Sequence, residues 1–193
     1  LRKNSNVFKL ITVGRLHPAK GHLKMLEVFH HLLKDGINAE LLIVGGGIER
    51  DKIENYINYL GLSNSVFLKG YCSQVEVAKL LNKSDLFLFT PLANYNQKST
   101  ETQGLAISEA MACGLPVISF NNGGVRYTFE DGISGFLVRE NHIEEMSKKI
   151  RRLLNDEILL NNMSKAALEF VRNNYSKSII DNRWEKFYDE LLA

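Results

Sequence analysis

The sequence predicts an α/β protein in which helices cover both faces of one doubly wound, parallel sheet of about six strands. Short apolar runs alternate along the chain with amphipathic stretches of helical length, which is typical of β–α–β units. Successive runs lie about 20–30 residues apart, which leaves room for the helical crossover that parallel strands require. The length of 193 residues is ample for one domain with a single core.

Six apolar runs are the candidate strands, and the amphipathic stretches between and after them are the candidate helices. Between the first two runs, five apolar side chains fall on one helical face, and Gly36 stands where that helix would end. The last part of the chain repeats the helical spacing three times, so we expect the chain to end in helices. The expected strands are residues 8–13, 40–44, 65–68, 85–89, 116–120 and 135–138.

The composition, 45% hydrophobic and 24% charged, is that of an ordinary globular protein. The 24 Lys+Arg and 22 Asp+Glu are spread along the chain, so we expect no nucleic-acid partner. Cys72 and Cys113 form no C-x-x-C motif, which argues against disulfides and zinc and favours a reducing cytosol. No apolar run reaches about 18 residues, so we expect no membrane crossing and a cytoplasmic location. The chain begins with Leu1 rather than Met, which suggests a fragment.

The first strand is followed by a turn that carries two positive charges. Arg15 and Lys20 stand five residues apart, ahead of the first predicted helix. A guanidinium binds oxyanions in a bidentate manner and an ammonium acts as a point charge, so together they suit a diphosphate. The alternative is a pair of solvated surface cations. His17 and His22 flank Lys20, where they either touch a phosphate or, in the interpretation we favour, are solvated loop histidines.

Glycine and aromatic residues follow the next two strands. Gly45, Gly46 and Gly47 allow close approach of the backbone to a ligand and expose N–H groups at a helix start. Arg50 stands where the dinucleotide fingerprint has a further glycine, and the next strand ends without an acidic residue, so a nicotinamide dehydrogenase fits poorly. Tyr71 comes after that strand, where its ring either stacks on a base or caps the core.

The connection from the fourth strand into the next helix carries the most information. It begins with a polar loop at residues 94–100, where a doubly wound sheet forms its ligand crevice, although a mobile surface loop is the alternative. Gly104 would let N–H groups of the opening helix reach a phosphate. Glu101 and Glu109 have seven residues between them, a spacing that decides nothing by itself.

In order and spacing, these segments resemble the retaining glycosyltransferases of the family 4 type (glycosyl transferases group 1), specifically their C-terminal, donor-binding domain. The motifs are a Gly-Arg turn with a following Lys-Gly, a glycine turn, a Gly-aromatic turn, and Glu-x7-Glu that continues as Glu-Ala-Met-Ala-x-Gly-x-Pro-Val-Ile. The resemblance covers nearly the whole chain. It implies the C-terminal half of a GT-B fold, with a Rossmann-like nucleotide-sugar-binding domain at residues 1–175. A C-terminal helix at 176–193 would cross to an N-terminal domain absent from this chain.

Carried over residue by residue, the resemblance implies roles for ten site residues and for two neighbours of one of them. Arg15 and Lys20 would neutralise the donor diphosphate and stabilise the departing nucleotide, and Glu101 would bind hydroxyls of the transferred sugar. Glu109 would accept hydrogen bonds from the ribose hydroxyls. The other donor-binding positions would be Gly14, Gly46, Tyr71 with Cys72 and Ser73 beside the base, and Gln103, Gly104 and Leu105, which would offer backbone N–H groups.

The resemblance implies no cofactor and no metal ion, with the nucleotide sugar as substrate. The sequence has no D-x-D, no H-E-x-x-H and no Cys/His cluster, so Arg15 and Lys20 would take the place of a cation. Gln103 departs from the family pattern, which commonly has an aromatic residue there. We interpret Cys113 as a packing residue rather than a nucleophile.

The expected function is metal-independent transfer of a hexose-type sugar from a nucleotide sugar to a glycan, lipid or other hydroxyl acceptor, as in polysaccharide biosynthesis. The N-terminal domain would supply the acceptor site, the full-length enzyme would contact a membrane peripherally, and this fragment alone would be inactive. Two other classes stay open on the same fold: a nucleotide-sugar epimerase or hydrolase, and a non-catalytic nucleotide-sugar-binding module.

Overall fold

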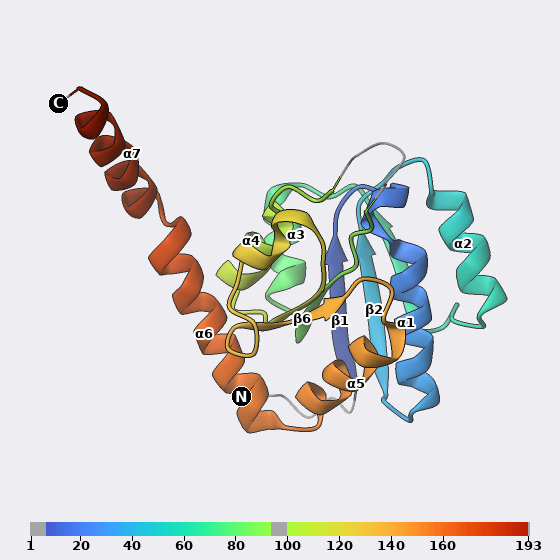
Figure 1. Cartoon of the computed structure of the whole chain (residues 1–193). Helices are drawn as coiled ribbons and strands as arrows, with labels where there is room; N and C mark the ends of the chain where they lie inside the picture. The colour runs from blue at the N-terminus through green and yellow to red at the C-terminus, as the bar shows by residue number, and fades with distance from the viewer. Residues whose placement is uncertain (1–6, 94–99, 193) are drawn as a thin grey trace.

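The computed structural model describes residues 7–93 and 100–192, and these residues form one sheet of six parallel strands (Figure 1). The strand order β3-β2-β1-β4-β5-β6 is that of the Rossmann fold. All six predicted strands are confirmed, with ends that differ by no more than two residues. They are β1 (Phe8–Val13), β2 (Ala39–Val44), β3 (Val66–Gly70), β4 (Leu86–Phe89), β5 (Val117–Asn121) and β6 (Gly135–Arg139).

Helices cover both faces of the sheet, which confirms the doubly wound arrangement (Figure 1). They are α1 (His22–Lys34), α2 (Arg50–Tyr59), α3 (Gln74–Leu81), α4 (Leu105–Ala112), α5 (Ile143–Leu154), α6 (Glu157–Tyr175) and α7 (Lys177–Leu192), with the 3-10 turns η1 (Pro18–Lys20) and η2 (Gly123–Tyr127). On one face, α1, α2 and α5 bury Phe29, Ile53 and Ile150. On the other face, α3 and α4 bury Leu81 and Ile107.

The strands are apolar along most of their length because both faces of the sheet are covered. All four residues of β4 are buried. In β1, Leu10 joins the core beneath α1, whereas Ile11 joins the core beneath α4. The chain first places β2 on one side of β1 and later returns to place β4 on the other, where Leu10 pairs with Leu86. This reversal of strand order opens a crevice at the carboxyl ends of β1 and β4.

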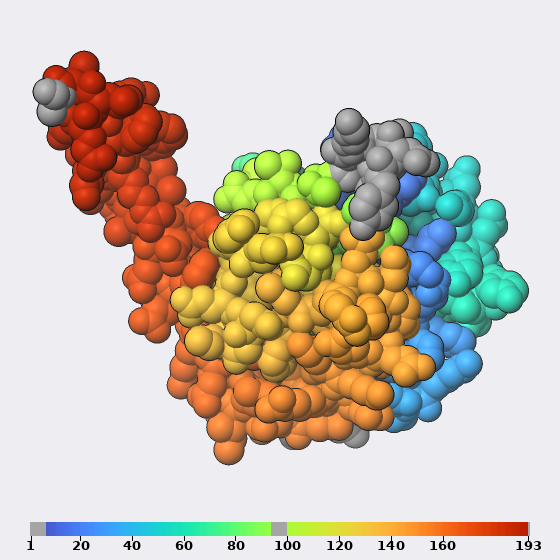
Figure 2. Space-filling view, viewed as in Figure 1, coloured from blue at the N-terminus to red at the C-terminus, as the bar shows by residue number. Residues whose placement is uncertain are grey.

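The last helix leaves the body of the domain. After α6 ends at Tyr175, Ser176 is extended and α7 projects away from the sheet (Figure 1, Figure 2). Within the described range Lys177–Leu192, no side chain of α7 is buried. Trp184, Phe187 and Tyr188 contact one another at ring-centroid distances of 5.8–6.0 Å. None of the helices in the described ranges is long and apolar enough to span a membrane.

The first residue of α1 is a buried histidine. The side chain of His22 is 2% exposed, and its Nδ1 has no hydrogen-bond partner among the described residues. Burial, together with the nearby charge of Lys20, lowers the pKa of His22 to about 4. The interpretation of His22 as a solvated loop residue is therefore wrong, because the first turn of α1 directs it inward. His17 instead caps η1, where its Nδ1 accepts a hydrogen bond from the Ala19 N–H at 3.3 Å.

Deletion of residues 177–193 is expected to leave the rest of the chain folded. Because α7 buries none of its described side chains, the melting temperature measured by circular dichroism should change by less than about 3 °C. As a control, a longer deletion from residue 160 onward also removes Met163 and Ala167 from the core and should unfold the domain. A loss of more than about 10 °C on removal of α7 alone would contradict this expectation.

The buried His22 should make stability depend on pH. Its folded-state pKa of about 4 lies below the ordinary 6.5, so the unfolded chain takes up the proton first as the pH falls. The free energy of unfolding should therefore drop by about 3 kcal/mol between pH 7 and pH 4 on account of this group. His22→Leu should remove that part of the loss in urea titrations, whereas the exposed-site control His31→Ala should retain it. Parallel pH profiles for His22→Leu and the unmodified chain would refute the assignment.

Candidate functional site

A cavity of about 400 Å³ occupies the crevice at the ends of β1 and β4. Seven of the ten predicted site residues line it, so the structure brings together residues from two distant parts of the chain. The position matches the place where doubly wound sheets bind their ligands. The cavity is lined by Val13, Gly14, Arg15, Lys20, Phe89, Glu101, Thr102, Gln103, Gly104, Leu105 and Ala106.

Two cations and one carboxylate define the electrostatics of this cavity. The Lys20 Nζ pairs with Glu101 Oε2, and both side chains are largely buried. The same Nζ lies 5.4 Å from the centroid of the Phe89 ring, within the range of a cation–π contact. Arg15 is exposed at the rim. The cavity thus combines two cationic side chains with one carboxylate.

The N-terminus of α4 points additional donors at this space. Gly104 is the N-cap of α4, and among the described residues no side chain caps its first turn. The next two residues, Leu105 and Ala106, line the cavity. The first N–H groups of a helix have no partners within the helix and carry its positive dipole end, so they favour an anion. The predicted contribution of backbone N–H groups at this turn to donor binding stays a prediction.

Backbone contacts after β5 fix the position of Glu101. The Glu101 N–H donates to Asn122 Oδ1 at 2.9 Å, and the Gly124 N–H donates to the Glu101 carbonyl at 2.8 Å. A Cβ added at Gly124 would stand 1.7 Å from the Thr102 carbonyl oxygen, so only glycine fits there. We did not predict Asn122 or Gly124 as site residues. A detectable signal was the pair of glycines directly after a strand, the same pattern that marks the turn after β2.

The glycine turn after β2 packs against the turn that carries Arg15. A Cβ at Gly45 would stand 1.9 Å from the Gly14 carbonyl oxygen, and the Leu16 N–H donates to the Gly46 carbonyl at 2.9 Å. The close approach made possible by these glycines is therefore to the chain itself, and it holds the Gly14–Arg15 turn at the cavity. Gly46 does not line the cavity.

Tyr71 covers this glycine turn. A Cβ at Gly46 would lie 2.3 Å from the Tyr71 Cε2, which shows that the ring rests on the Gly46 backbone. The side chain is nevertheless 82% exposed, so the interpretation of Tyr71 as a cap on the core is wrong. Tyr71 presents its outer face to solvent and lies outside the cavity at β1 and β4.

Glu109 lies in a neighbouring groove of about 420 Å³ between α3 and α4. Burial, together with the nearby carboxylate of Glu109, raises the pKa of the Cys113 thiol, which agrees with a packing role. Ser73, expected beside the base, caps α3 by accepting from the Glu76 N–H. Because Val13 lines both spaces, this groove adjoins the first cavity. It is lined by Val13, Cys72, Gln74, Val77, Ala78, Leu81, Glu109, Ala112 and Cys113.

The connection into α4 also contacts the end of α6. The side chain of Gln103 lies near the phenol of Tyr175, and burial raises the pKa of that phenol. The Tyr175 hydroxyl donates to the Tyr127 carbonyl at 3.2 Å. Gln103, the departure from the family pattern, therefore lies beside an element that is distant in the sequence. Apart from Thr100, the predicted crevice loop at residues 94–100 lies outside the described residues.

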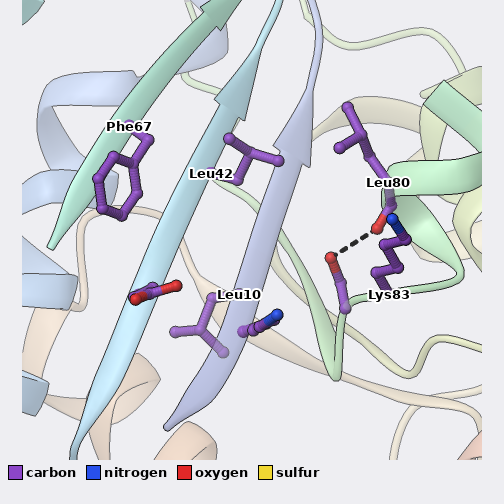
Figure 3. Close-up of a pocket in the computed structure, with 8 residues that line it drawn as sticks. Leu10, Leu42, Phe67, Leu80 and Lys83 are labelled. Carbon is purple, nitrogen blue, oxygen red and sulfur yellow. Dashed lines mark hydrogen bonds between the residues drawn. The ribbon is translucent and has the colours of Figure 1, made fainter. Parts of the chain in front are cut away.

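A further hollow, of about 160 Å³, lies on the sheet near the amino ends of the strands. Figure 3 shows Leu10, Leu42 and Phe67 from three neighbouring strands facing it, with Leu80 and Lys83 from the α3 side. None of the predicted site residues lines it. In the described part of the chain, no group of three or more His, Cys, Asp or Glu side chains is placed to share a metal ion. The cavity at β1 and β4, with its adjoining groove, is therefore the candidate site.

Known proteins share this sequence pattern and fold. The profile of the family "Glycosyl transferases group 1" matches residues 1–170. N-acetyl-alpha-D-glucosaminyl L-malate synthase of Bacillus anthracis is 30% identical over 183 residues, which are 95% of this chain and 45% of that protein. A crystal structure of a mutant of S. aureus TarM, in complex with Fondaparinux, alpha-GlcNAc-glycerol and UDP, is 28% identical, with a TM-score of 0.82 over 96% of this chain and 36% of that chain.

A separately solved C-terminal domain has the same fold. The C-terminal domain of LpcC, a glycosyl transferase group 1 family protein from Francisella tularensis, is 20% identical, with a TM-score of 0.74 over 88% of this chain and 87% of that chain. In contrast, the chain spans less than half of the synthase and of TarM. The family and the fold predicted from the sequence are confirmed. The chain belongs to the glycosyl transferases group 1 and comprises the Rossmann-like, C-terminal domain of their GT-B fold.

Proposed function

We propose that this chain is the donor-binding domain of a glycosyltransferase that moves a sugar from a nucleotide sugar to a hydroxyl group of a glycan, lipid or other acceptor. The observation that carries the proposal is that Arg15, Lys20 and Glu101 face one cavity at the N-terminus of α4. Two cations and the positive end of a helix suit a diphosphate, and the carboxylate beside them suits sugar hydroxyls.

The donor occupies both adjoining spaces, the cavity and the groove. The diphosphate lies over the N-terminus of α4, and the nucleoside lies in the groove between α3 and α4, where Glu109 accepts from the ribose hydroxyls. Val13 lines both spaces, so a nucleotide laid across it reaches both. The sugar lies at Glu101, and Arg15 and Lys20 stabilise the nucleotide diphosphate as it departs.

The donor we propose is UDP-N-acetylglucosamine. A TarM mutant is solved with UDP and alpha-GlcNAc-glycerol, and the B. anthracis relative is named N-acetyl-alpha-D-glucosaminyl L-malate synthase. Transfer retains the anomeric configuration, as the family resemblance implies. It needs no cofactor or metal ion, because Arg15 and Lys20 supply the positive charge that the leaving diphosphate requires.

The acceptor side belongs to an N-terminal domain outside this chain. The aromatic stripe of α7 at Trp184, Phe187 and Tyr188 packs on that domain in the full-length protein, which also provides the acceptor site. The 193-residue chain alone binds donor without turning it over. A cytoplasmic location with peripheral membrane contact of the full-length enzyme stays a prediction.

The products formed by the full-length protein distinguish a transferase from the two alternatives, an epimerase or hydrolase and a non-catalytic binding module. An epimerase or a hydrolase converts UDP-N-acetylglucosamine without any acceptor, and a binding module leaves it unchanged. A transferase produces UDP and a labelled acceptor in equal amounts. Product analysis with and without acceptor therefore decides between the three.

Loss of either cation should weaken binding of the diphosphate. Calorimetric titration of the 193-residue chain with UDP should show about a 10- to 100-fold loss of affinity in Arg15→Ala and in Lys20→Ala, because each removes charge-assisted hydrogen bonds. The control Lys177→Ala, which removes an exposed cation on α7, should bind UDP as the unmodified chain does. Equal affinities in all four proteins would argue against a diphosphate at this cavity.

Glu109→Ala should affect the nucleoside end of the ligand. We expect UDP and UMP to lose affinity by a similar factor of about 5 to 20, whereas Arg15→Ala should weaken UDP more than UMP. The control Glu190→Ala, on α7, should change neither affinity, and EDTA should leave UDP binding unaltered. If UMP binding were insensitive to Glu109→Ala, the ribose would lie elsewhere.

A further inference from the structure

A buried amide links three segments around the proposed sugar site. Asn122, directly after β5, is 4% exposed. Its Oδ1 accepts a hydrogen bond from the Glu101 N–H at 2.9 Å, and its Nδ2 donates to Glu140 Oε2 at 2.7 Å. The other oxygen of Glu140 accepts from the Ala93 N–H at 3.1 Å. One side-chain pair thus joins two residues that both lie within the connection from β4 to α4.

The chemistry of these groups admits one arrangement of the amide. A carboxylate accepts hydrogen bonds only, so the Asn122 Nδ2 must face Glu140, which leaves Oδ1 for the Glu101 N–H. A buried backbone N–H or amide without a partner is costly, so each of the three hydrogen bonds supports the other two. We refer to Asn122, Glu140 and their two backbone partners as the amide–carboxylate clamp.

The clamp determines where the Glu101 carboxylate lies. The backbone of Glu101 is held by Asn122 on its N–H and by Gly124 on its carbonyl, while its side chain reaches Lys20 in the cavity. The Glu101 carboxylate lies beside the two cations, Arg15 and Lys20, that we propose bind the diphosphate. It would repel a phosphate group next to it, so it has to face the sugar instead. A small movement of this backbone therefore changes recognition of the sugar more than that of the diphosphate.

We propose that Asn122 and Glu140 are positioning residues that set the sugar selectivity of the donor site by holding Glu101. The proposal rests on the proposed function, in which Glu101 binds the transferred sugar. Neither residue lines the cavity, so both act through Glu101. The measured quantity is the ratio of the affinity for UDP-N-acetylglucosamine to that for UDP, because this ratio isolates the sugar from the nucleotide.

A swap of the two groups provides the test. Asn122→Asp alone sets two carboxylates against each other at a contact of 2.7 Å, and Glu140→Gln alone leaves one N–H without a partner. The double variant restores all three hydrogen bonds: the new amide at 140 donates to the new carboxylate at 122, which also accepts from the Glu101 N–H. Thermal unfolding of each variant shows whether it is folded.

We expect each single variant to lower the affinity ratio by about tenfold with UDP affinity within about twofold, and the double variant to recover the ratio to within about threefold. Glu101→Ala should lower the ratio at least as far. The clamp's role would be overturned if the folded single variants left the affinity ratio unchanged. It would also be overturned if a folded double variant failed to restore the ratio.

Failure of the proposed function gives results that differ from those expected if only the clamp proposal fails. If the unmodified chain binds neither UDP nor UDP-N-acetylglucosamine, or if Glu101→Ala leaves the ratio unchanged, the assignment of the sugar site fails. The clamp itself is then judged by amide hydrogen exchange. Exchange of the Glu101 N–H should quicken by about tenfold in Asn122→Ala, with the Ile11 N–H in β1 as the control. Unaltered exchange at Glu101 would show that Asn122 does not hold this backbone.

Discussion

The site depends on one constraint of the parallel sheet: all strands end at the same edge, and their order reverses between β1 and β4. The helices that follow these strands lie on opposite faces, α1 on one and α4 on the other, so the space between the two strand ends stays open. The turns around this space are held by backbone contacts at Gly45 and Gly124, where a Cβ would clash. Arg15, Lys20 and Glu101 are therefore placed mainly by the backbone of the turns that carry them.

The charges that face the cavity are few, and two of them are paired with each other. Lys20 is paired with Glu101, so a diphosphate sugar bound as proposed would exchange this ion pair for two ligand contacts, one at each partner. His22 lies close to Lys20, yet its pKa of about 4 keeps it neutral at neutral pH, and it adds no third positive charge. Burial of this histidine therefore serves the electrostatics of the site although the side chain belongs to the core.

The strands and seven residues of the cavity could be predicted from the sequence, whereas the contacts that support those seven residues could not. Strands such as β4 are predictable because burial on both faces makes them continuously apolar. Tyr71 was ambiguous because an aromatic at a strand end suits a core, a base or, as found, a glycine backbone. Asn122 and Glu140 were missed because they are 18 residues apart and neither belongs to a motif, so only the fold reveals their hydrogen bond.

The connection into α4 lies beside the end of α6. Gln103 lies near the half-buried phenol of Tyr175, the last residue of α6. The Tyr175 hydroxyl donates to the Tyr127 carbonyl at 3.2 Å, and its ring meets Phe170 edge to face. Since α7 begins two residues after Tyr175, a displacement of α7 against a second domain would reach Tyr175 first, and with it the connection that carries Gln103 and the Gly104 cap, where the diphosphate is proposed to lie.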